Sequence, residues 1–113
     1  MKYFDWNEDK NRLLKIEREI SFEEVLIAIE SGNLLDTIEH PKRGRYPNQK
    51  IFVVNINNYA YLVPFVEDEK KIFLKTIIPS RKATKKYIIK GGKKGNILSL
   101  LRKIRKSLKI LKK

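Results

Sequence analysis

The sequence contains no cysteine among its 113 residues. It therefore has no disulfides, thiolate nucleophiles or cysteine-ligated zinc sites. It has a single histidine, so we expect no histidine-based metal site and no other cofactor. Acidic residues interrupt any secretory signal near the N-terminus, and no apolar run approaches the roughly 18 residues that a membrane helix needs. We expect a cytoplasmic protein without a membrane partner, although its C-terminal segment has the composition to bind anionic surfaces.

Several enzyme motifs are also missing. The chain has no GKS or GKT phosphate loop, no G-x-G-x-x-G fingerprint, no H-E-x-x-H pair and no G-x-S-x-G elbow. Each of these motifs supplies groups that its chemistry requires, such as backbone amides around phosphates or paired imidazoles on zinc. Nucleotide hydrolases, dinucleotide enzymes, zinc proteases and serine hydrolases therefore have no support in this sequence.

The net charge is strongly positive and unevenly distributed. The formal charge is +13, and residues 1–89 contribute only +3 of it, with 16 Lys/Arg against 13 Asp/Glu. Residues 90–113 contain 10 Lys/Arg and no acid. In this segment apolar residues recur at helical spacing, namely Ile97, Leu101, Ile104, Leu108 and Leu111. We predict a globular domain over 1–89 and a basic amphipathic extension over 90–113, helical or disordered, with an anionic partner such as nucleic acid.

The pattern of residues 1–89 predicts an α+β fold. We expect two N-terminal helices packed on an antiparallel sheet of about four strands, followed by a short C-terminal helix. A capping box at Ser21–Glu24 begins the second helix, and Asn57-Asn58 joins two strands as a hairpin. The expected strands are 2–6, 34–40, 50–56, 59–66 and 71–79, and the expected helices are 8–19, 22–31 and 81–88.

Two groups of basic residues are candidates for phosphate binding. Loop 41–49 and the next strand hold the cations Lys42, Arg43, Arg45 and Lys50. A solvated loop explains this group about equally well. The second group follows the last strand and consists of Arg81, Lys82, Lys85 and Lys86, with Tyr87 beside it. Arg81 and Lys85 are four residues apart, so a helix presents both on one face. Single-stranded RNA favours such cations near aromatic rings.

Two other side chains are candidates for RNA chemistry. His40 lies beside the basic loop and could donate or accept a proton if an RNA backbone lay there, although a single surface histidine more often has no catalytic role. Tyr61 shares one side of a strand with Tyr59 and Phe65 by the period of two. These aromatic residues can stack on bases, but that spacing is more typical of a hydrophobic core.

The residues also resemble a known family, the BrnT-type toxins of bacterial type II toxin-antitoxin systems, within the RelE and ParE group. The resemblance depends on Phe4-Asp5-Trp6-Asn7 with Lys10-Asn11, on Ile20–Glu24, and on Ile77–Tyr87, in the family's order and spacing. This chain departs from the family at Glu17-Arg18-Glu19, where the usual Lys-His-Gly is replaced, so no role of that histidine transfers. It also reads Pro79-Ser80-Arg81 in place of Ser-Ala-Arg.

The resemblance implies a RelE-like fold, a metal-independent endoribonuclease that cleaves mRNA and inhibits translation, and a cognate antitoxin that neutralises it. We assign Arg81 to the phosphate of the transition state, with Lys75 and Lys85 as further catalytic cations. The candidate proton donors or acceptors are His40, Tyr61 and a lysine whose pKa neighbouring cations depress. The remaining candidates are RNA-binding residues. Two alternatives stay open: a non-enzymatic RNA- or DNA-binding module, and an interaction protein whose tail helix binds an acidic partner or a membrane surface.

Overall fold

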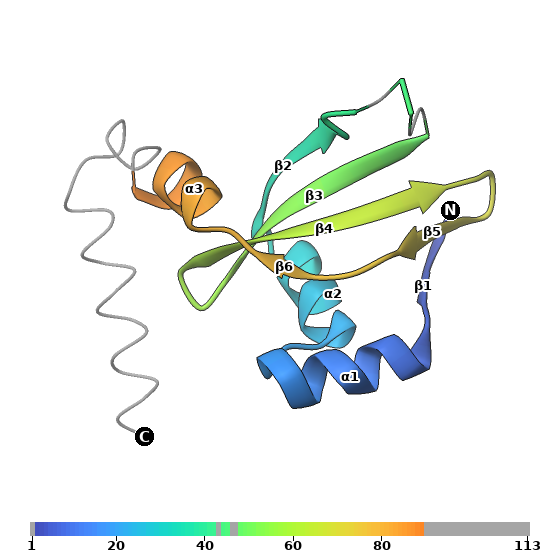
Figure 1. Cartoon of the computed structure of the whole chain (residues 1–113), viewed down its shortest axis with the longest axis horizontal. Helices are drawn as coiled ribbons and strands as arrows, with labels where there is room; N and C mark the ends of the chain where they lie inside the picture. The colour runs from blue at the N-terminus through green and yellow to red at the C-terminus, as the bar shows by residue number, and fades with distance from the viewer. Residues whose placement is uncertain (1, 43, 46–47, 90–113) are drawn as a thin grey trace.

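The computed structural model describes residues 2–42, 44–45 and 48–89. The basic extension predicted over 90–113 lies outside the described residues, as does the candidate Arg43. The described elements combine helices with one sheet, so the protein is α+β, as the sequence predicted (Figure 1).

The two N-terminal helices begin at polar caps. α1 (Glu8–Arg18) starts after Asn7, whose side chain accepts a hydrogen bond from the Lys10 N–H. α2 (Phe22–Glu30) starts after Ser21, which forms the predicted capping box with Glu24 in both directions. These side chains satisfy amides that have no partner within the helix. Both helices therefore begin where local sequence chemistry places them.

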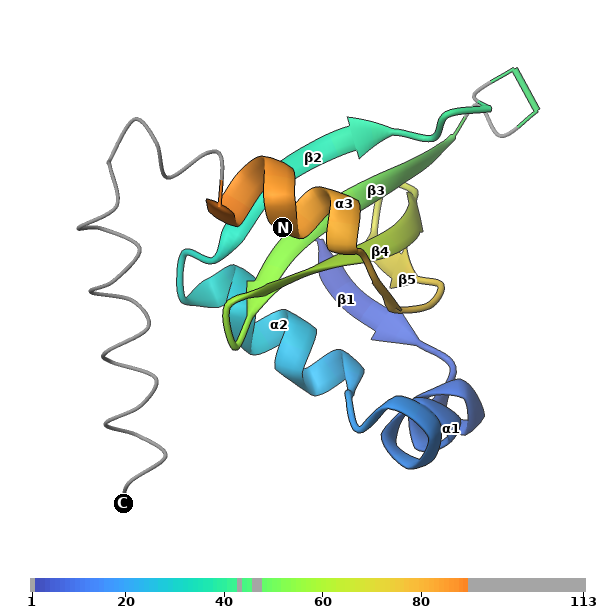
Figure 2. The same ribbon diagram turned by 60° about the vertical axis from the view of Figure 1, so that its left-hand side comes forward.

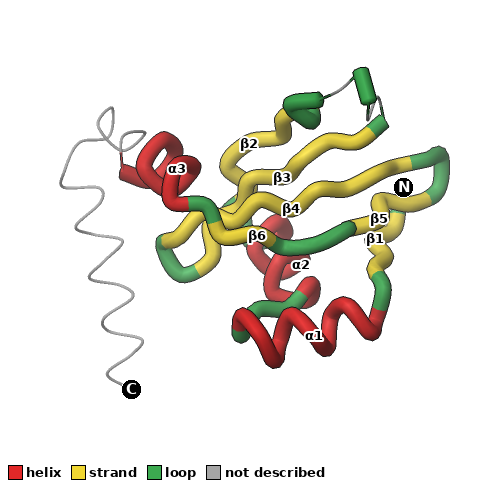
Figure 3. The backbone as a smooth tube through the Cα atoms, viewed as in Figure 1, coloured by secondary structure: helices red, strands yellow, loops and turns green. Residues whose placement is uncertain are grey.

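The sheet contains six strands, which are more than the four expected. They are β1 (Tyr3–Trp6), β2 (Leu34–Glu39), β3 (Gln49–Ile56), β4 (Tyr59–Glu67), β5 (Lys71–Leu74) and β6 (Ile78–Pro79). The order is β1-β5-β4-β3-β2, and β6 pairs with β4 (Figure 3). The expectation of a purely antiparallel sheet was wrong, because β1 runs parallel to β5. The sequence showed β1 as a strand but carried no local signal of its distant partner.

The predicted strand 71–79 is divided in the structure. β5 pairs with β4 only from Lys71 to Leu74, and β6 then returns to β4 at Tyr61 and Leu62. Pro64 explains the break. Its carbonyl accepts the Lys75 N–H at 2.8 Å, and in an antiparallel ladder a residue's N–H faces the same neighbour as its carbonyl. Proline has no N–H, so the ladder cannot continue past this point.

The β3–β4 connection is the expected two-residue hairpin. Asn57 and Asn58 have φ of 55° and 65°, the left-handed conformation that asparagine adopts more readily than most residues. The Asn55 side chain accepts the Asn58 N–H at 2.9 Å. Two consecutive positive φ angles are typical of a type I′ turn, whose twist matches that of the strands. The turn sets the full register from Gln49↔Val66 to Ile56↔Tyr59.

Helices cover both faces of the sheet. α1 and α2 pack on one face, where their side chains meet Phe52 and Phe65, whose stacked rings have centroids 3.9 Å apart. α3 (Arg81–Ala83) continues without a break into a π-helical turn, η1 (Thr84–Ile89), and both lie on the opposite face (Figure 2). There Ala83 and Ile88 pack on Val53 and Ala60. Alternation along β3 and β4 supplies apolar residues to both faces.

Candidate nucleic-acid interface

The C-terminal helical segment α3–η1 is capped by one hydroxyl and held to the sheet by another. Ser80 caps the segment by accepting the Ala83 N–H at 3.0 Å. The Thr84 hydroxyl accepts the Ala60 N–H and donates to the Ser80 carbonyl, both at 2.8 Å. Ala60 lies on β4, so Thr84 joins the helix directly to the sheet. The side of the segment that carries Thr84 therefore faces the sheet.

A third contact joins the segment to the edge strand β2. The Tyr87 hydroxyl donates to an Asp36 carboxylate oxygen at 2.6 Å. This hydrogen bond lowers the pKa of Asp36, with a further contribution from the Thr37 N–H, and it raises the pKa of Tyr87. Tyr87 was predicted to bind RNA, but its hydroxyl is engaged with the protein, so only the ring is available to a base.

Four cations lie on the exposed side of the same segment. They are Arg81, Lys82, Lys85 and Lys86, and together they define what we call the α3 basic face. Arg81, Lys82 and Lys85 form no ion pair within the part of the chain that the structure describes. The Lys86 ammonium is 5.1 Å from the centroid of the Tyr87 ring, a distance compatible with a cation–π contact. The predicted grouping of Arg81 with Lys85 on one exposed segment therefore occurs.

Lys75 lies in the connection between β5 and β6 and is exposed. Its backbone bonds to Pro64, whereas Ser80, the cap of α3, bonds to Ala60. Four residues of β4 separate these anchor points, which corresponds to about 13 Å along the strand. Lys75 is therefore offset along the sheet from the start of α3 and is not part of the α3 basic face.

Lys50 and Tyr61 lie on the opposite face of the sheet, beside α1 and α2. Alternation places Lys50 with Phe52, and its ammonium is 3.8 Å from a Glu67 oxygen. Tyr61 packs against the core under the helices, as the more conservative interpretation of the sequence predicted. Burial, then the charges of Glu24 and Tyr59, raise the pKa of Tyr61, so its phenol stays protonated near neutral pH. Tyr61 is therefore unsuited to act as a base.

The loop candidates are at a third location, the connection between β2 and β3. The His40 Nδ1 accepts the Lys42 N–H at 3.0 Å, and the Arg45 N–H donates to the Lys42 carbonyl at 2.9 Å. Lys42 and Arg45 are exposed. Register places this loop beyond Glu39, three residues along β2 from Asp36, or about 10 Å from the Tyr87 contact. The loop and the α3 basic face are thus separate clusters, because Asp36 lies near the start of β2 and the loop follows its other end.

The arrangement suits binding of a phosphate backbone better than binding of a metal. Within the described ranges, no group of three or more His, Asp or Glu side chains is placed to hold a metal ion. Four cations within six residues gather phosphate-binding groups on one exposed segment. Arg81 adds a planar fork that can bond two phosphate oxygens at once.

Two residues that position this face had no signal in the sequence as functional residues. Asp36 is 51 residues from Tyr87 and reads as an ordinary polar residue of a strand. Thr84 is a poor helix former whose role depends on a strand 24 residues earlier. Only the three-dimensional arrangement shows that both support the α3 basic face.

Most residues that carry the family resemblance have structural roles here. Trp6 stacks on Phe22 with ring centroids 5.6 Å apart. Asn11 is 1% exposed, and its amide accepts the Phe22 N–H and donates to Glu23, each at 2.8 Å. These contacts join β1, α1 and α2. These residues therefore hold the helical layer together, whereas Arg81 is exposed on the other side of the sheet.

Comparison with known proteins returned no match: no family model, no curated protein and no solved structure is similar to this chain at a significant level. Among the described residues, no helix combines the length and the apolar character needed to cross a bilayer.

Proposed function

We propose that this protein is a cytoplasmic RNA-directed toxin of the BrnT and RelE kind, which cleaves mRNA, inhibits translation and is neutralised by a cognate antitoxin. The observation that carries the proposal is the α3 basic face, where exposed cations alternate with inward anchors on one segment. Ser80, Thr84 and Tyr87 hold the segment. Its phosphate-binding groups are therefore preorganised.

The cleavage that we propose uses the RNA's own 2′-hydroxyl as the nucleophile. Its oxygen attacks the adjacent phosphorus, the bond to the 5′-oxygen of the next nucleotide breaks, and a 2′,3′-cyclic phosphate remains. The 2′-hydroxyl loses one proton and the leaving 5′-oxygen gains one. In this scheme Arg81 stabilises charge on the non-bridging oxygens, Lys85 supports it, and Lys75 holds the next phosphate along the strand.

Proton transfer is assigned to His40 on its chemistry, because an imidazole ring can both accept and donate a proton. It lies on the β2–β3 loop, outside the α3 basic face. In this proposal a bound RNA strand extends from Lys85 along β2 to the loop, where Lys42 and Arg45 contact further phosphates. The RNA therefore brings the two clusters into one site.

A second function, a non-enzymatic RNA-binding module, is favoured by one specific observation. Among the described residues, the α3 basic face offers Arg and Lys side chains but contains no carboxylate or imidazole. Such a face is sufficient for phosphate binding without cleavage. In this case an antitoxin or another acidic partner still competes with RNA for the same cations.

The test compares Arg81→Ala with Arg12→Ala in the full chain. Both arginines are exposed, but Arg12 lies on α1, where it pairs with Asp9 on the far face of the sheet. Each purified variant is incubated with end-labelled mRNA, with and without ribosomes. We expect Arg81→Ala to cut about a hundredfold more slowly, which corresponds to about 3 kcal/mol of lost transition-state stabilisation, and Arg12→Ala to behave as the parent.

The outcomes separate the two functions. Cyclic-phosphate products that decline in Arg81→Ala support the nuclease. Absence of products, together with RNA binding that weakens in Arg81→Ala, supports the binding module. Equal behaviour of the Arg81→Ala and Arg12→Ala proteins in both assays contradicts any role for the α3 basic face.

A further inference from the structure

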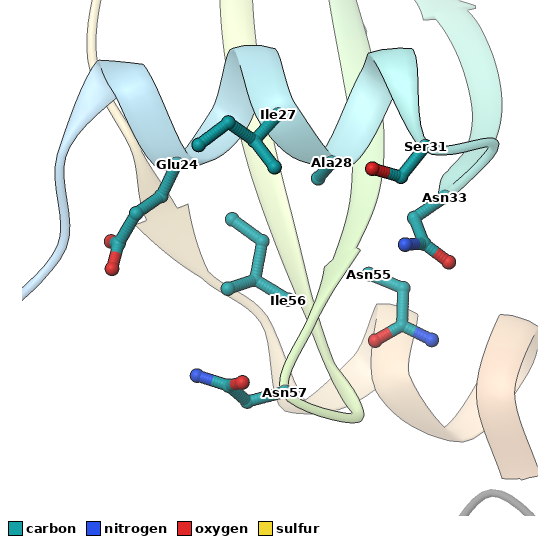
Figure 4. Close-up of a pocket in the computed structure, with 8 residues that line it drawn as sticks. All are labelled: Glu24, Ile27, Ala28, Ser31, Asn33, Asn55, Ile56 and Asn57. Atoms are coloured by element: carbon teal, nitrogen blue, oxygen red, sulfur yellow. The ribbon is translucent and has the colours of Figure 1, made fainter. Parts of the chain in front are cut away.

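A groove runs along α2 on the face of the molecule opposite the α3 basic face. One hollow of about 240 Å³ lies between α2 and the β3–β4 hairpin (Figure 4). A second, of about 400 Å³, lies at the junction of α1 and α2. Both are lined by Glu24, so the two hollows adjoin along α2, and together we call them the α2 groove. Its lining residues include Lys15, Glu19, Ile20, Glu24, Ile27 and Ile56.

The α2 groove combines apolar and acidic side chains. Ile27 is 61% exposed, which is unusual for an isoleucine on a helix that packs against a sheet. Figure 4 shows Ile27 and Ile56 on either side of the hollow, with Glu24 at its end. Residues 8–30, which contain both helices, hold 7 of the 13 acids against 4 Lys/Arg. The helical layer is therefore net acidic in a strongly basic protein.

The chain supplies a segment with the complementary character. Residues 97–111 place an Ile or Leu at every third or fourth position, and Lys or Arg occupies five of the ten positions between them. In helical form these apolar residues make one stripe, with Arg105 and Lys109 along one border and Leu100 and Ser107 along the other. An apolar stripe flanked by positive charge matches an apolar groove flanked by negative charge.

The geometry of the described end of the chain permits this contact. Tyr87 bonds to Asp36 at the start of β2, and β2 directly follows the end of α2, so Ile89 lies near the Asn33 end of the α2 groove. Residues 90–96, which include three glycines, span up to about 24 Å when extended. A helix over 97–111 is about 21 Å long, longer than the roughly 13 Å of α2 that borders the groove.

We propose that residues 97–111 dock as an amphipathic helix in the α2 groove of their own chain, with their apolar stripe on Ile27 and Ile56 and their cations beside Glu19 and Glu24. Docking removes the exposed isoleucine from water and changes the acidic helical layer into a basic surface. This inference does not depend on RNA cleavage, because none of its residues belongs to the α3 basic face.

The absence of cysteine makes a direct test possible. Ser99→Cys introduces a single thiol about 200° around the helix from Ile97, away from the apolar stripe, and a nitroxide spin label is attached there in the full-length protein. Paramagnetic broadening of backbone amide signals then reports which surface the segment approaches. We expect broadening at Ile27 and Ser31, and none at Lys42 in the β2–β3 loop.

Matched variants test the contact itself. Ile27→Ser on the groove, or Ile104→Ser on the segment, should abolish the broadening. Leu13→Ser is the control, because Leu13 is an exposed residue of α1 that lines neither hollow. Ile27 and Leu13 are both exposed, and the amide spectrum of each variant will show that the fold persists.

Several outcomes overturn the proposal. One is broadening that is absent at Ile27 or uniform over the surface. Another is broadening that survives Ile27→Ser. A third is broadening of an isotope-labelled copy by a separate spin-labelled copy, which assigns the groove to a second molecule. Broadening at Ile27 that is unchanged by adding anionic phospholipid vesicles supports intramolecular docking, and its absence until vesicles are added assigns the segment to a lipid surface instead.

Discussion

The hydroxyl of Tyr87 donates a 2.6 Å hydrogen bond to the carboxylate of Asp36, across 51 residues of sequence. This contact fastens the C-terminal helical segment to the edge strand of the sheet. Because the partners belong to η1 and β2, the bond fixes how the segment crosses the sheet and therefore where the α3 basic face points. The proposed RNA binding therefore depends on the hydrogen bond between Tyr87 and Asp36.

Removing that bond should loosen the segment. We expect Tyr87→Phe to lower the free energy of unfolding by about 1 kcal/mol, at the low end for a bond to a charged group because both partners are only half-buried. Urea denaturation measures the change. Tyr3→Phe removes an exposed hydroxyl and should leave stability unaltered. Equal stability of the Tyr87→Phe and Tyr3→Phe proteins shows that the contact contributes nothing.

The same pair predicts a pH dependence. The pKa of Asp36 is lower in the folded state than its ordinary value of about 3.9, so its stabilising effect is present above that value and is lost as pH falls through the lowered pKa. The pKa of Tyr87 is raised, so its contribution is present below about 10 and is lost as pH rises through the raised pKa. The melting-temperature difference between the parent and Asp36→Asn should be constant from about pH 5 to 9 and smaller outside that range.

Two other carboxylates also make the stability of the folded state fall as the pH becomes acidic. A hydrogen bond from Asn11 is the main cause of a lowered pKa at Glu23, and one from Lys2 is the main cause at Glu67. The Asp36→Asn protein should therefore still lose stability below about pH 4. A variant whose stability no longer depends on pH in this range contradicts the assignment of these groups.

Thr84 should be sensitive to loss of its hydroxyl. In Thr84→Val the buried Ala60 N–H loses its acceptor while the side-chain shape is kept, so the free energy of unfolding should fall by about 1–3 kcal/mol. Thr84→Ser keeps the hydroxyl and loses only a methyl group, so it should be less destabilised. Thermal unfolding of the two proteins provides the measurement. A Thr84→Val protein as stable as the parent refutes this role.

Asn11 should be the most sensitive polar residue of the helical layer. Asn11→Ala removes the acceptor of the Phe22 N–H and the donor to Glu23. Because the residue is buried, we expect a loss of about 2–3 kcal/mol. Asn33→Ala, at an exposed position after α2, is the control. The denaturant midpoint should shift far more for Asn11→Ala than for Asn33→Ala.

RNA affinity should depend on salt through the α3 basic face. Loss of one phosphate contact lowers the slope of log K against log salt concentration by about 0.7 for single strands. Lys85→Ala should show this reduction, whereas Lys10→Ala, on α1, should keep the parent slope. Fluorescence anisotropy with a labelled single-stranded RNA at several salt concentrations tests it. Identical slopes in the two proteins exclude Lys85 from the interface.

Much of the fold was predictable because its signals are local. The capping box of α2 and the Asn57-Asn58 hairpin depend on neighbours within four residues, and both occur as expected. The parallel pairing of β1 with β5 was not predictable, since nothing near Tyr3 specifies a partner at Lys71. Nor was the break at Lys75, which arises from the missing N–H of Pro64 on another strand.

The candidate site shows the same division. Sequence spacing correctly placed Arg81 and Lys85 on one exposed segment. It also grouped Lys50 and Tyr61 with them, but strand alternation puts these two on the other face of the sheet. Alternation shows which strand residues share a face of the sheet. Long-range packing decides which of the two faces that is.

By itself, the sequence determined the composition of the elements: where helices begin, which strands form a hairpin, and that the cations are concentrated after the last strand. Those features follow from hydrogen bonds and side-chain periodicity over a few residues. The tertiary structure decided which cations share a surface, because contacts such as Tyr87 with Asp36 and Thr84 with Ala60 join segments far apart in the chain. Such contacts form only when the whole sheet is assembled, which is why the α3 basic face and the α2 groove become visible only in the folded protein.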